Sequence, residues 1–240
     1  MSELGHLEAV TFDATHTLLL CPELGAQYAA VLSRHGIAVD VRDVETAIPR
    51  VWRELACSAA PSSDRFANHS HHPRGARGFW RRYIERICEV VGAPRPSPFA
   101  AAELFDRFAH PDAWQIAPGA EIMLTDLRSR GLKLAVISNW DQRLPLLLDR
   151  IGLAYLFDTV AVSSIVGVEK PHPRIFETTL AALGVAAENA LHVGDSRRED
   201  LEGAQGAGMH ALLLAPSGNG DIEALADLPD FLFGRELPGG

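Results

Sequence analysis

The stretch Leu7-Glu-Ala-Val-Thr-Phe-Asp13 is a short, largely apolar run that ends in an acidic residue. A run of this length is typical of a buried strand in a parallel sheet, because helices cover both faces of such a sheet. Four similar runs follow along the chain, and most of them also end in a polar or glycine-containing turn. The later runs occupy residues 132–137, 159–162, 190–193 and 210–214.

Helical segments alternate with these runs. Residues 119–130 precede the second run, 143–151 follow it, and 173–183 precede the fourth. Strands that alternate with helices indicate a parallel sheet with helices packed on both faces. In such sheets ligands bind outside the carboxyl ends of the strands. We therefore predict an α/β fold with a doubly wound parallel sheet, and we expect the polar residues that end the runs to face one crevice.

A long segment interrupts the alternation after the first run. About a hundred residues separate the first run from the second, whereas a few tens separate the others. Because a structureless segment of this length is uncommon inside a compact domain, we expect an all-helical insert. We predict an α/β core at 1–16 and 115–240, with the insert at 17–114. Helical patterning within the insert covers residues 25–35, 41–57, 78–91 and 99–108.

A stretch rich in serine, proline and histidine lies within the insert, at residues 61–73. Its composition predicts a mobile loop. It holds His69, His71 and His72, which invite interpretation as a metal site. Their polar, proline-flanked surroundings favour a solvated loop instead.

Composition narrows the classes of function. The 240 residues are 47% hydrophobic and 22% charged, which excludes disorder of the whole chain. The net charge of −9 argues against bulk binding of nucleic acid or of an anionic membrane, but it leaves a small phosphorylated molecule open as a partner. Three cysteines without a CxxC pair are typical of a reducing compartment. With no signal peptide and no long apolar stretch, we expect a soluble cytoplasmic protein, either a monomer or a homodimer.

The polar residues that end the runs include three acids, Asp13, Asp195 and Asp200. Three carboxylates in one crevice would repel one another and raise each other's pKa unless a cation lies between them. Mg²⁺, a hard divalent ion that prefers oxygen ligands, is the simplest such cation. Ser138 and Lys170 beside it could hold the oxygens of a phosphoryl group.

Taken one at a time, these residues have simpler explanations. Asp13 alone would be a turn residue at the end of a strand, and Asp195 alone would be a helix cap. Lys170 before a proline would be a solvated loop residue, and Asn139 would cap the helix that follows it. These polar residues form four groups along the chain, and each group lies beside an apolar run or turn. Their occurrence together and in this order favours a site that binds a cation and a phosphoryl group.

These motifs resemble those of the haloacid dehalogenase-like hydrolase superfamily, from about residue 10 to residue 214. Asp13 lies where the family has its first motif, and residues 131–139 are similar to the second motif. Residues 170–176 resemble the third motif, and 192–200 resemble the fourth. The resemblance implies a sheet with strand order 5-4-1-2-3. It also implies that the helical insert is a cap that closes over the site and selects the substrate.

The resemblance implies a role for each acid. Asp13 would be the nucleophile that attacks phosphorus and forms an aspartyl-phosphate. Asp13, Asp195 and the backbone carbonyl of Thr15 would bind Mg²⁺, and Asp200 would complete that metal site. The family's activity would then be that of a Mg²⁺-dependent phosphatase acting on a small phosphorylated metabolite.

Other residues of the motifs would bind the substrate. Ser138 and Lys170 would bind the phosphoryl oxygens and take part in catalysis, and Asn139 would line the same pocket. Thr15 and His16, in the turn after Asp13, would also lie against the phosphoryl group.

The sequence departs from the family pattern in that turn. Phosphatases of the family usually carry a second aspartate two residues after the nucleophile, where this chain has Thr15, and a glycine next to it, where this chain has His16. A threonine hydroxyl cannot serve as general acid near neutral pH, and loss of such a group typically costs about 10²- to 10⁴-fold in rate.

Three explanations of the departure stay open. The chain could be a phosphatase whose leaving group needs no acid, or whose acid comes from elsewhere, with His16 a conceivable donor. It could be a 2-haloacid dehalogenase, although dehalogenases need no metal and this chain keeps the pair Asp195 and Asp200. It could be a low-activity or non-catalytic protein that binds phosphate and Mg²⁺. Residues 17–114 contain no lysine, which excludes the usual phosphonatase mechanism.

Overall fold

The structure is a computed structural model, and it describes residues 6–57 and 74–234. The predicted loop at 61–73, with its three histidines, lies outside the described residues. The chain divides into two compact units. One unit comprises Met1–Leu20 and Gln115–Gly240, and the other comprises Cys21–Trp114.

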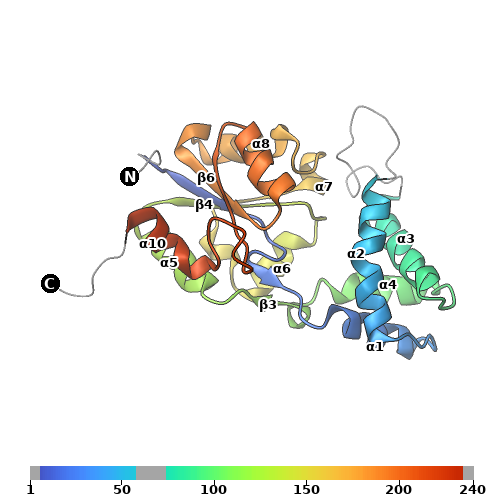
Figure 1. Cartoon of the computed structure of the whole chain (residues 1–240). Coiled ribbons are helices and arrows are strands. Elements are labelled where there is room, and N and C mark those ends of the chain that lie inside the picture. Colours follow the sequence, from blue (N-terminus) through green and yellow to red (C-terminus); the bar gives the residue numbers. More distant parts are fainter. Residues whose placement is uncertain (1–5, 58–73, 235–240) are drawn as a thin grey trace. The chain divides into compact units, whose positions relative to one another are not determined.

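The first unit is built on a parallel sheet of five described strands (Figure 1). Its strand order is β5-β4-β1-β6-β7. When these five strands are numbered 1 to 5 along the chain, the order read from the β7 edge is 5-4-1-2-3, so the predicted topology is confirmed. The strands are β1 Ala9–Phe12, β4 Lys133–Ser138, β5 Thr159–Val162, β6 Ala190–Gly194 and β7 His210–Leu213.

The central strand β1 explains why the first run is apolar. All four of its residues are buried, and it pairs with β4 on one side and β6 on the other. A strand in this position has both faces covered and both edges hydrogen-bonded, so it tolerates few polar side chains. Because the pairing is parallel on both sides, the carboxyl ends of β1, β4 and β6 lie at the same edge of the sheet.

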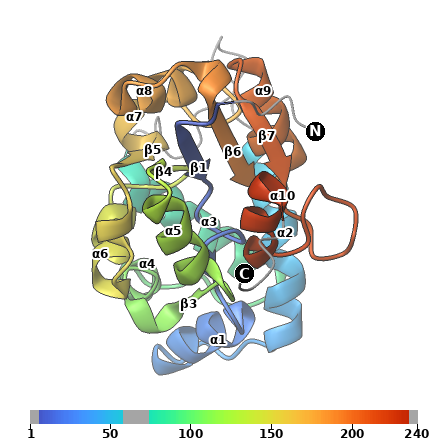
Figure 2. The same ribbon diagram turned by 90° about the vertical axis from the view of Figure 1, so that its left-hand side faces the viewer.

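Helices cover both faces of this sheet. Figures 1 and 2 show α8 on one face and α5 with α10 on the other. The helices of this unit are α5 Ala120–Ser129, α6 Leu144–Ile151, α7 Ser163–Val166, α8 Pro173–Leu183, α9 Gly203–Gly206 and α10 Leu228–Phe233. Shorter turns complete it: the 3-10 helices η2 Ala154–Leu156, η3 Ala187–Asn189 and η5 Leu225–Asp227, and the π-helix η4 Arg197–Glu202.

The second unit is helical in its described residues. Its helices are α1 Leu24–Arg34, α2 Val41–Cys57, α3 Gly75–Val90 and α4 Pro98–Arg107, followed by the 3-10 helix η1 Pro111–Ala113. An aromatic core lies between α2 and α3, where Phe79 and Tyr83 are buried and Trp52 and Trp80 pack against them. α4 begins at a capped end, because the Ser97 hydroxyl accepts a hydrogen bond from the backbone N–H of Ala100 (3.1 Å).

The first crossing between the units differs from the sequence-based boundary. The prediction ends the first core segment at His16, whereas the structure extends it to Leu20. The reason is a two-residue antiparallel ladder, in which β2 Leu19–Leu20 pairs with β3 Gln115–Ile116. A ladder this short leaves no periodic pattern in the sequence. Among the described helices, none has both the length and the apolar composition needed to cross a membrane.

Candidate functional site

The parallel sheet brings the predicted polar residues to one edge. Asp13 follows β1 directly, and its backbone N–H donates to the carbonyl of Val193 in β6 (2.9 Å). Ser138 is the last residue of β4, and Asp195 follows β6 directly. Asp200 lies in η4 and is only 1% exposed.

The ammonium group of Lys170 joins these residues. Its Nζ atom donates to Oδ1 of Asp13 (2.6 Å) and to Oδ1 of Asp200 (2.5 Å). The Ser138 hydroxyl donates to the same Oδ1 atom of Asp13 (3.1 Å). All four side chains are buried, so these charged contacts are shielded from water. Buried charges of this kind persist only when paired and hydrogen-bonded, and here each one is.

Three carboxylates face one another at this position. Asp13, Asp195 and Asp200 each offer one oxygen, and these three atoms lie within 4.8 Å of one another. Lys170 contributes a single positive charge against three negative ones. An all-oxygen donor set with excess negative charge suits a hard divalent cation such as Mg²⁺. The donor chemistry of these residues therefore fits the ion that the resemblance implies.

Burial and mutual repulsion perturb these acids. Burial raises the pKa of Asp13 to about 6, with Asp200 and Asp195 adding to the rise and Lys170 opposing it. Desolvation and the charge of Asp200 raise the pKa of Asp195 to about 6, although part of this side chain reaches solvent. Burial opposes ionisation of Asp200 as well, but Lys170 and His192 outweigh it and hold the pKa of Asp200 below its usual range. A bound cation would therefore stabilise the ionised carboxylates of this cluster.

The side chain of Asn139, which the sequence predicts to line the phosphoryl pocket, is hydrogen-bonded within the protein. Its Oδ1 atom accepts from the backbone N–H of Lys170 (2.7 Å), and its Nδ2 atom donates to the carbonyl of Lys170 (3.1 Å). Nδ2 also donates to Oε2 of Glu199 (3.1 Å). Both ends of the amide are therefore occupied by protein, and in this structure Asn139 holds the backbone of the residue that carries the ammonium. A contact of Asn139 with substrate stays a prediction.

The turn after Asp13 shows why a glycine suits position 16. His16 has φ = 65°, in the left-handed region that non-glycine residues seldom occupy. Its backbone N–H donates to the carbonyl of Leu19 (2.8 Å), which closes the turn, and its side chain is exposed. The hydroxyl of Thr15 is buried and has no hydrogen-bond partner in the described part of the chain. This turn therefore keeps an unused polar group beside the carboxylates.

Sequence reasoning missed four residues of this region: Thr11, His192, Gly194 and Glu199. His192 contacts Oδ1 of Asp200 through its Nε2 atom (3.1 Å), and Glu199 contacts Asn139. Gly194 ends β6 where the Asp200 carboxylate packs against its Cα, so a Cβ atom there would overlap that carboxylate. For His192, Gly194 and Glu199 the available signal was the run 192–200 itself, in which they are interleaved with the two acids, whereas Thr11 lies in the first apolar run.

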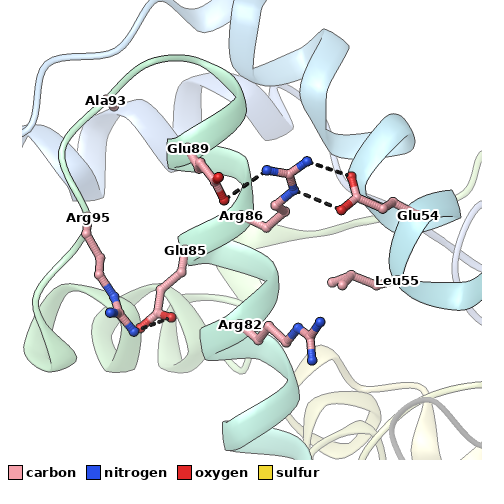
Figure 3. A pocket seen from close by; sticks show the side chains of 8 residues that line it. All are labelled: Glu54, Leu55, Arg82, Glu85, Arg86, Glu89, Ala93 and Arg95. Carbon is pink, nitrogen blue, oxygen red and sulfur yellow. Dashed lines mark hydrogen bonds and ion pairs between the residues drawn. The ribbon is translucent and has the colours of Figure 1, made fainter. Parts of the chain in front are cut away.

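A separate hollow of about 520 Å³ lies in the helical unit (Figure 3). Figure 3 shows that its charges largely neutralise one another: Arg86 bridges Glu54 and Glu89, and Arg95 pairs with Glu85. None of the site residues predicted from the sequence lines it. The candidate residues therefore gather at the carboxylate cluster and not at this hollow.

Mg²⁺ should raise the melting temperature more at about pH 7.5 than at about pH 5. The folded-state pKa of Asp13 and of Asp195 is about 6, whereas an unfolded aspartate ionises near pH 4. A raised folded-state pKa means that the ion-free fold loses stability as the pH rises from about 4 through 6. A cation that binds the ionised carboxylates reverses this loss. Thermal unfolding with and without Mg²⁺ at both pH values measures the effect. Asp195→Asn should shrink it, and equal Mg²⁺ shifts at the two pH values would contradict the site.

Gly194→Ala should weaken Mg²⁺ binding by about 10- to 100-fold, because the added methyl group displaces the Asp200 carboxylate. Calorimetric titration with Mg²⁺ measures this. Gly206→Ala is the matched control, since a Cβ atom at Gly206 meets nothing within 4 Å in the described part of the chain. Unchanged affinity in a folded Gly194→Ala variant would show that Asp200 does not contribute to the cation site.

A family model described as haloacid dehalogenase-like hydrolase matches residues 7–208. A mouse (Mus musculus) protein named haloacid dehalogenase-like hydrolase domain-containing protein 3 is 37% identical over 222 residues, which cover 90% of this chain and 85% of that protein.

Solved structures agree on the fold. The crystal structure of a haloacid dehalogenase-like phosphatase from Thermococcus onnurineus matches with a TM-score of 0.65 and 27% identity, over 96% of this chain and all of that one. A 2-haloacid dehalogenase from Pseudomonas syringae matches almost equally, with a TM-score of 0.64, 27% identity and coverage of 94% and 98%. Fold similarity alone therefore does not separate the two chemistries. The chain belongs to the haloacid dehalogenase-like hydrolase family and is an enzyme of the hydrolase class.

Proposed function

We propose that this hydrolase is a Mg²⁺-dependent phosphatase that acts on a small phosphorylated metabolite through an aspartyl-phosphate. The observation that supports this most is the joining of Asp13, Lys170 and Asp200 by two short hydrogen bonds, with Asp195 at the same position. The similarity to the Thermococcus phosphatase agrees with it.

Asp13 is suited to nucleophilic attack. Lys170 and Ser138 both donate to Oδ1, and Oδ2 has no hydrogen-bond partner among the described residues. Oδ2 is therefore the oxygen that would bond to phosphorus while the bond from phosphorus to the ester oxygen breaks. Water then cleaves the aspartyl-phosphate, which releases phosphate and restores the carboxylate. A bound Mg²⁺ would supply charge stabilisation for the phosphoryl oxygens.

Lys170 and Ser138 serve the same step in two ways. Before reaction they hold the Asp13 carboxylate in one orientation through Oδ1. During reaction negative charge accumulates on the phosphoryl oxygens, and a fixed ammonium and hydroxyl stabilise that charge without reorganisation. Because the pKa of Lys170 lies above its usual value, held there by Asp13 and Asp200 against the effect of burial, the amine stays charged throughout.

The turn after Asp13 lacks the carboxyl group that would protonate the leaving group. An alkoxide leaving group needs a proton, and position 15 carries a threonine hydroxyl where phosphatases of the family usually have a carboxyl. We infer that turnover is slow for alkyl phosphates and faster for esters whose leaving group is already stable as an anion.

Two other functions stay in competition. A 2-haloacid dehalogenase would displace halide at carbon without a metal, and the Pseudomonas enzyme shares the fold. The convergence of three carboxylates on one position favours a cation and hence phosphate chemistry. A non-catalytic phosphate- and Mg²⁺-binding protein would use the same residues without turnover. The helical unit as a substrate-selecting cap, the cytoplasmic location and a monomeric or homodimeric state stay predictions.

Asp13→Asn should abolish hydrolysis of an aryl phosphate in the presence of Mg²⁺, because the amide cannot attack phosphorus. Release of the aryl alcohol by the purified protein measures this. Asp149→Asn, at an exposed position of α6, is the matched control and should keep wild-type activity.

The same experiment separates the alternatives. Turnover that survives Asp13→Asn contradicts the proposal. No turnover across a broad panel of phosphates, with Mg²⁺ bound, favours the binding protein. Halide release from a 2-haloacid without added metal favours the dehalogenase.

Thr15→Asp should raise turnover of alkyl phosphates by about 10²-fold or more, because it restores a carboxyl where the general acid is expected. Turnover of aryl phosphates should change much less, since their leaving groups need no proton. Steady-state kinetics with paired alkyl and aryl substrates measure the difference. A variant that folds and binds Mg²⁺ yet gains nothing on alkyl phosphates would show that the missing acid does not limit the enzyme.

A further inference from the structure

One face of the sheet carries a polar pair inside an apolar layer. Strand residues such as Ala9, Ala135 and Ile137 pack on this face against Ile175 and Phe176 of α8, and all are buried. Within the same layer lie Thr11 of β1 and His192 of β6, and both are completely buried. Polar side chains in such a layer destabilise the fold unless they are hydrogen-bonded. The hydrogen-bond partners of Thr11 and His192 therefore decide how this pair is accommodated at the centre of the sheet.

The strand register places this pair together. Thr11 and His192 are direct partners in the parallel pairing of β1 with β6, so their side chains point to the same face. Thr11 Oγ1 lies 2.8 Å from Nδ1 of His192. The ring of Phe176 packs edge-on against the imidazole, with centroids 5.3 Å apart and planes at 85°. The imidazole is therefore held both by a hydrogen bond and by apolar packing.

The other side of the imidazole faces the candidate cation site. Nε2 of His192 lies 3.1 Å from Oδ1 of Asp200, the oxygen that also accepts from Nζ of Lys170. Oδ2 of Asp200 accepts from the backbone N–H of Ser196 (2.9 Å). A continuous chain of contacts thus runs from Thr11 in the central strand, through His192, to the Asp200 carboxylate.

Donor and acceptor roles decide where the proton of His192 lies. The Asp200 carboxylate, paired with an ammonium and a backbone N–H, is ionised and can only accept. The contact with Asp200 is a hydrogen bond only in the tautomer that carries hydrogen on Nε2, because an unprotonated Nε2 would place its lone pair against those of the carboxylate. The ring is completely buried, packs against Phe176 and contacts the same oxygen that binds the Lys170 ammonium, and these surroundings disfavour a positive charge on the imidazole, so it is neutral. Nδ1 is then the acceptor.

Thr11 supplies the donor that this tautomer needs. Its single hydroxyl proton has two acceptors within reach, Nδ1 of His192 at 2.8 Å and the carbonyl of Leu191 at 3.3 Å. Donation to Leu191 would leave Nδ1 without a donor and allow the other tautomer, in which Nε2 no longer donates to Asp200. The shorter contact favours donation to His192.

We propose that Thr11 and His192 are positioning residues, in which the Thr11 hydroxyl selects the Nε2–H tautomer of His192 and the imidazole in turn orients the Asp200 carboxylate for cation binding. Donors on both oxygens of Asp200 prevent its rotation and leave its remaining lone pairs for the cation or for water bound to it. The inference rests on the proposed function only in that it takes a divalent cation as the ligand of this site.

Thr11→Val and Thr11→Ser form the matched pair that tests this relay. Valine has nearly the shape of threonine but no hydroxyl, whereas serine keeps the hydroxyl. Calorimetric titration with Mg²⁺ should show about a 10-fold loss of affinity for Thr11→Val and a change of less than about twofold for Thr11→Ser. Equal Mg²⁺ affinities of the two folded variants would overturn the proposal.

A spectroscopic measurement tests the tautomer directly and needs neither substrate nor metal. In ¹⁵N-histidine-labelled protein, the His192 signals are assigned by their loss in His192→Gln. The wild-type chain and Thr11→Ser should show a neutral ring with hydrogen on Nε2, and Thr11→Val should show the Nδ1–H form or a mixture.

A wild-type ring with hydrogen on Nδ1, or with hydrogen on both nitrogens, overturns the relay even if Thr11→Val fails to fold. A wild-type chain that binds no Mg²⁺ contradicts the proposed function and with it the cation role of Asp200. Binding of Mg²⁺ without phosphatase turnover leaves this inference intact and contradicts only the proposed reaction.

Discussion

The ammonium of Lys170, placed between the carboxylates of Asp13 and Asp200, is the contact on which this site depends. An unpaired buried charge costs several kcal/mol, so these three groups are stable only together. Asp13 follows the central strand, Asp200 lies in a π-helix, and Lys170 precedes α8. The pairing of these three charges therefore holds three distant segments of the sequence at one edge of the sheet. The residual negative charge, with Asp195 added, then makes that edge a place for a cation.

The central position of β1 explains how one strand serves both stability and chemistry. Its apolar residues are covered on both faces, and its two neighbours, β4 and β6, deliver Ser138 and Asp195 beside Asp13. Thr11 is the exception to the apolar pattern, and it is the residue that meets His192. The polar pair of Thr11 and His192 in the core of this sheet thus leads to the site. A strand at the edge of the sheet could not supply partners on both sides.

The turn after Asp13 lacks the residue for proton transfer, whereas the residues for charge stabilisation are present elsewhere in the site. The residues suited to holding a cation and a phosphoryl group are present and paired, as Lys170 and Ser138 show. The residue that would transfer a proton is replaced by Thr15, whose hydroxyl finds no partner among the described residues. His16 occupies a left-handed conformation that a glycine would adopt without strain. Charge stabilisation and proton transfer are therefore carried by different residues, so one can change while the other is kept.

The sequence by itself determined the class of fold and the candidate acids, because apolar runs and the residues that end them are properties of consecutive positions. It located the five strands of the parallel sheet and the helices of the insert to within a few residues, while the strand order came from the resemblance to a family. Only the tertiary structure decided that Asn139 holds the backbone of Lys170, that His192 joins Thr11 to Asp200, and that the first unit extends to Leu20. Those contacts depend on the register of neighbouring strands and on close approach between segments far apart in the chain, which no local pattern of residues records.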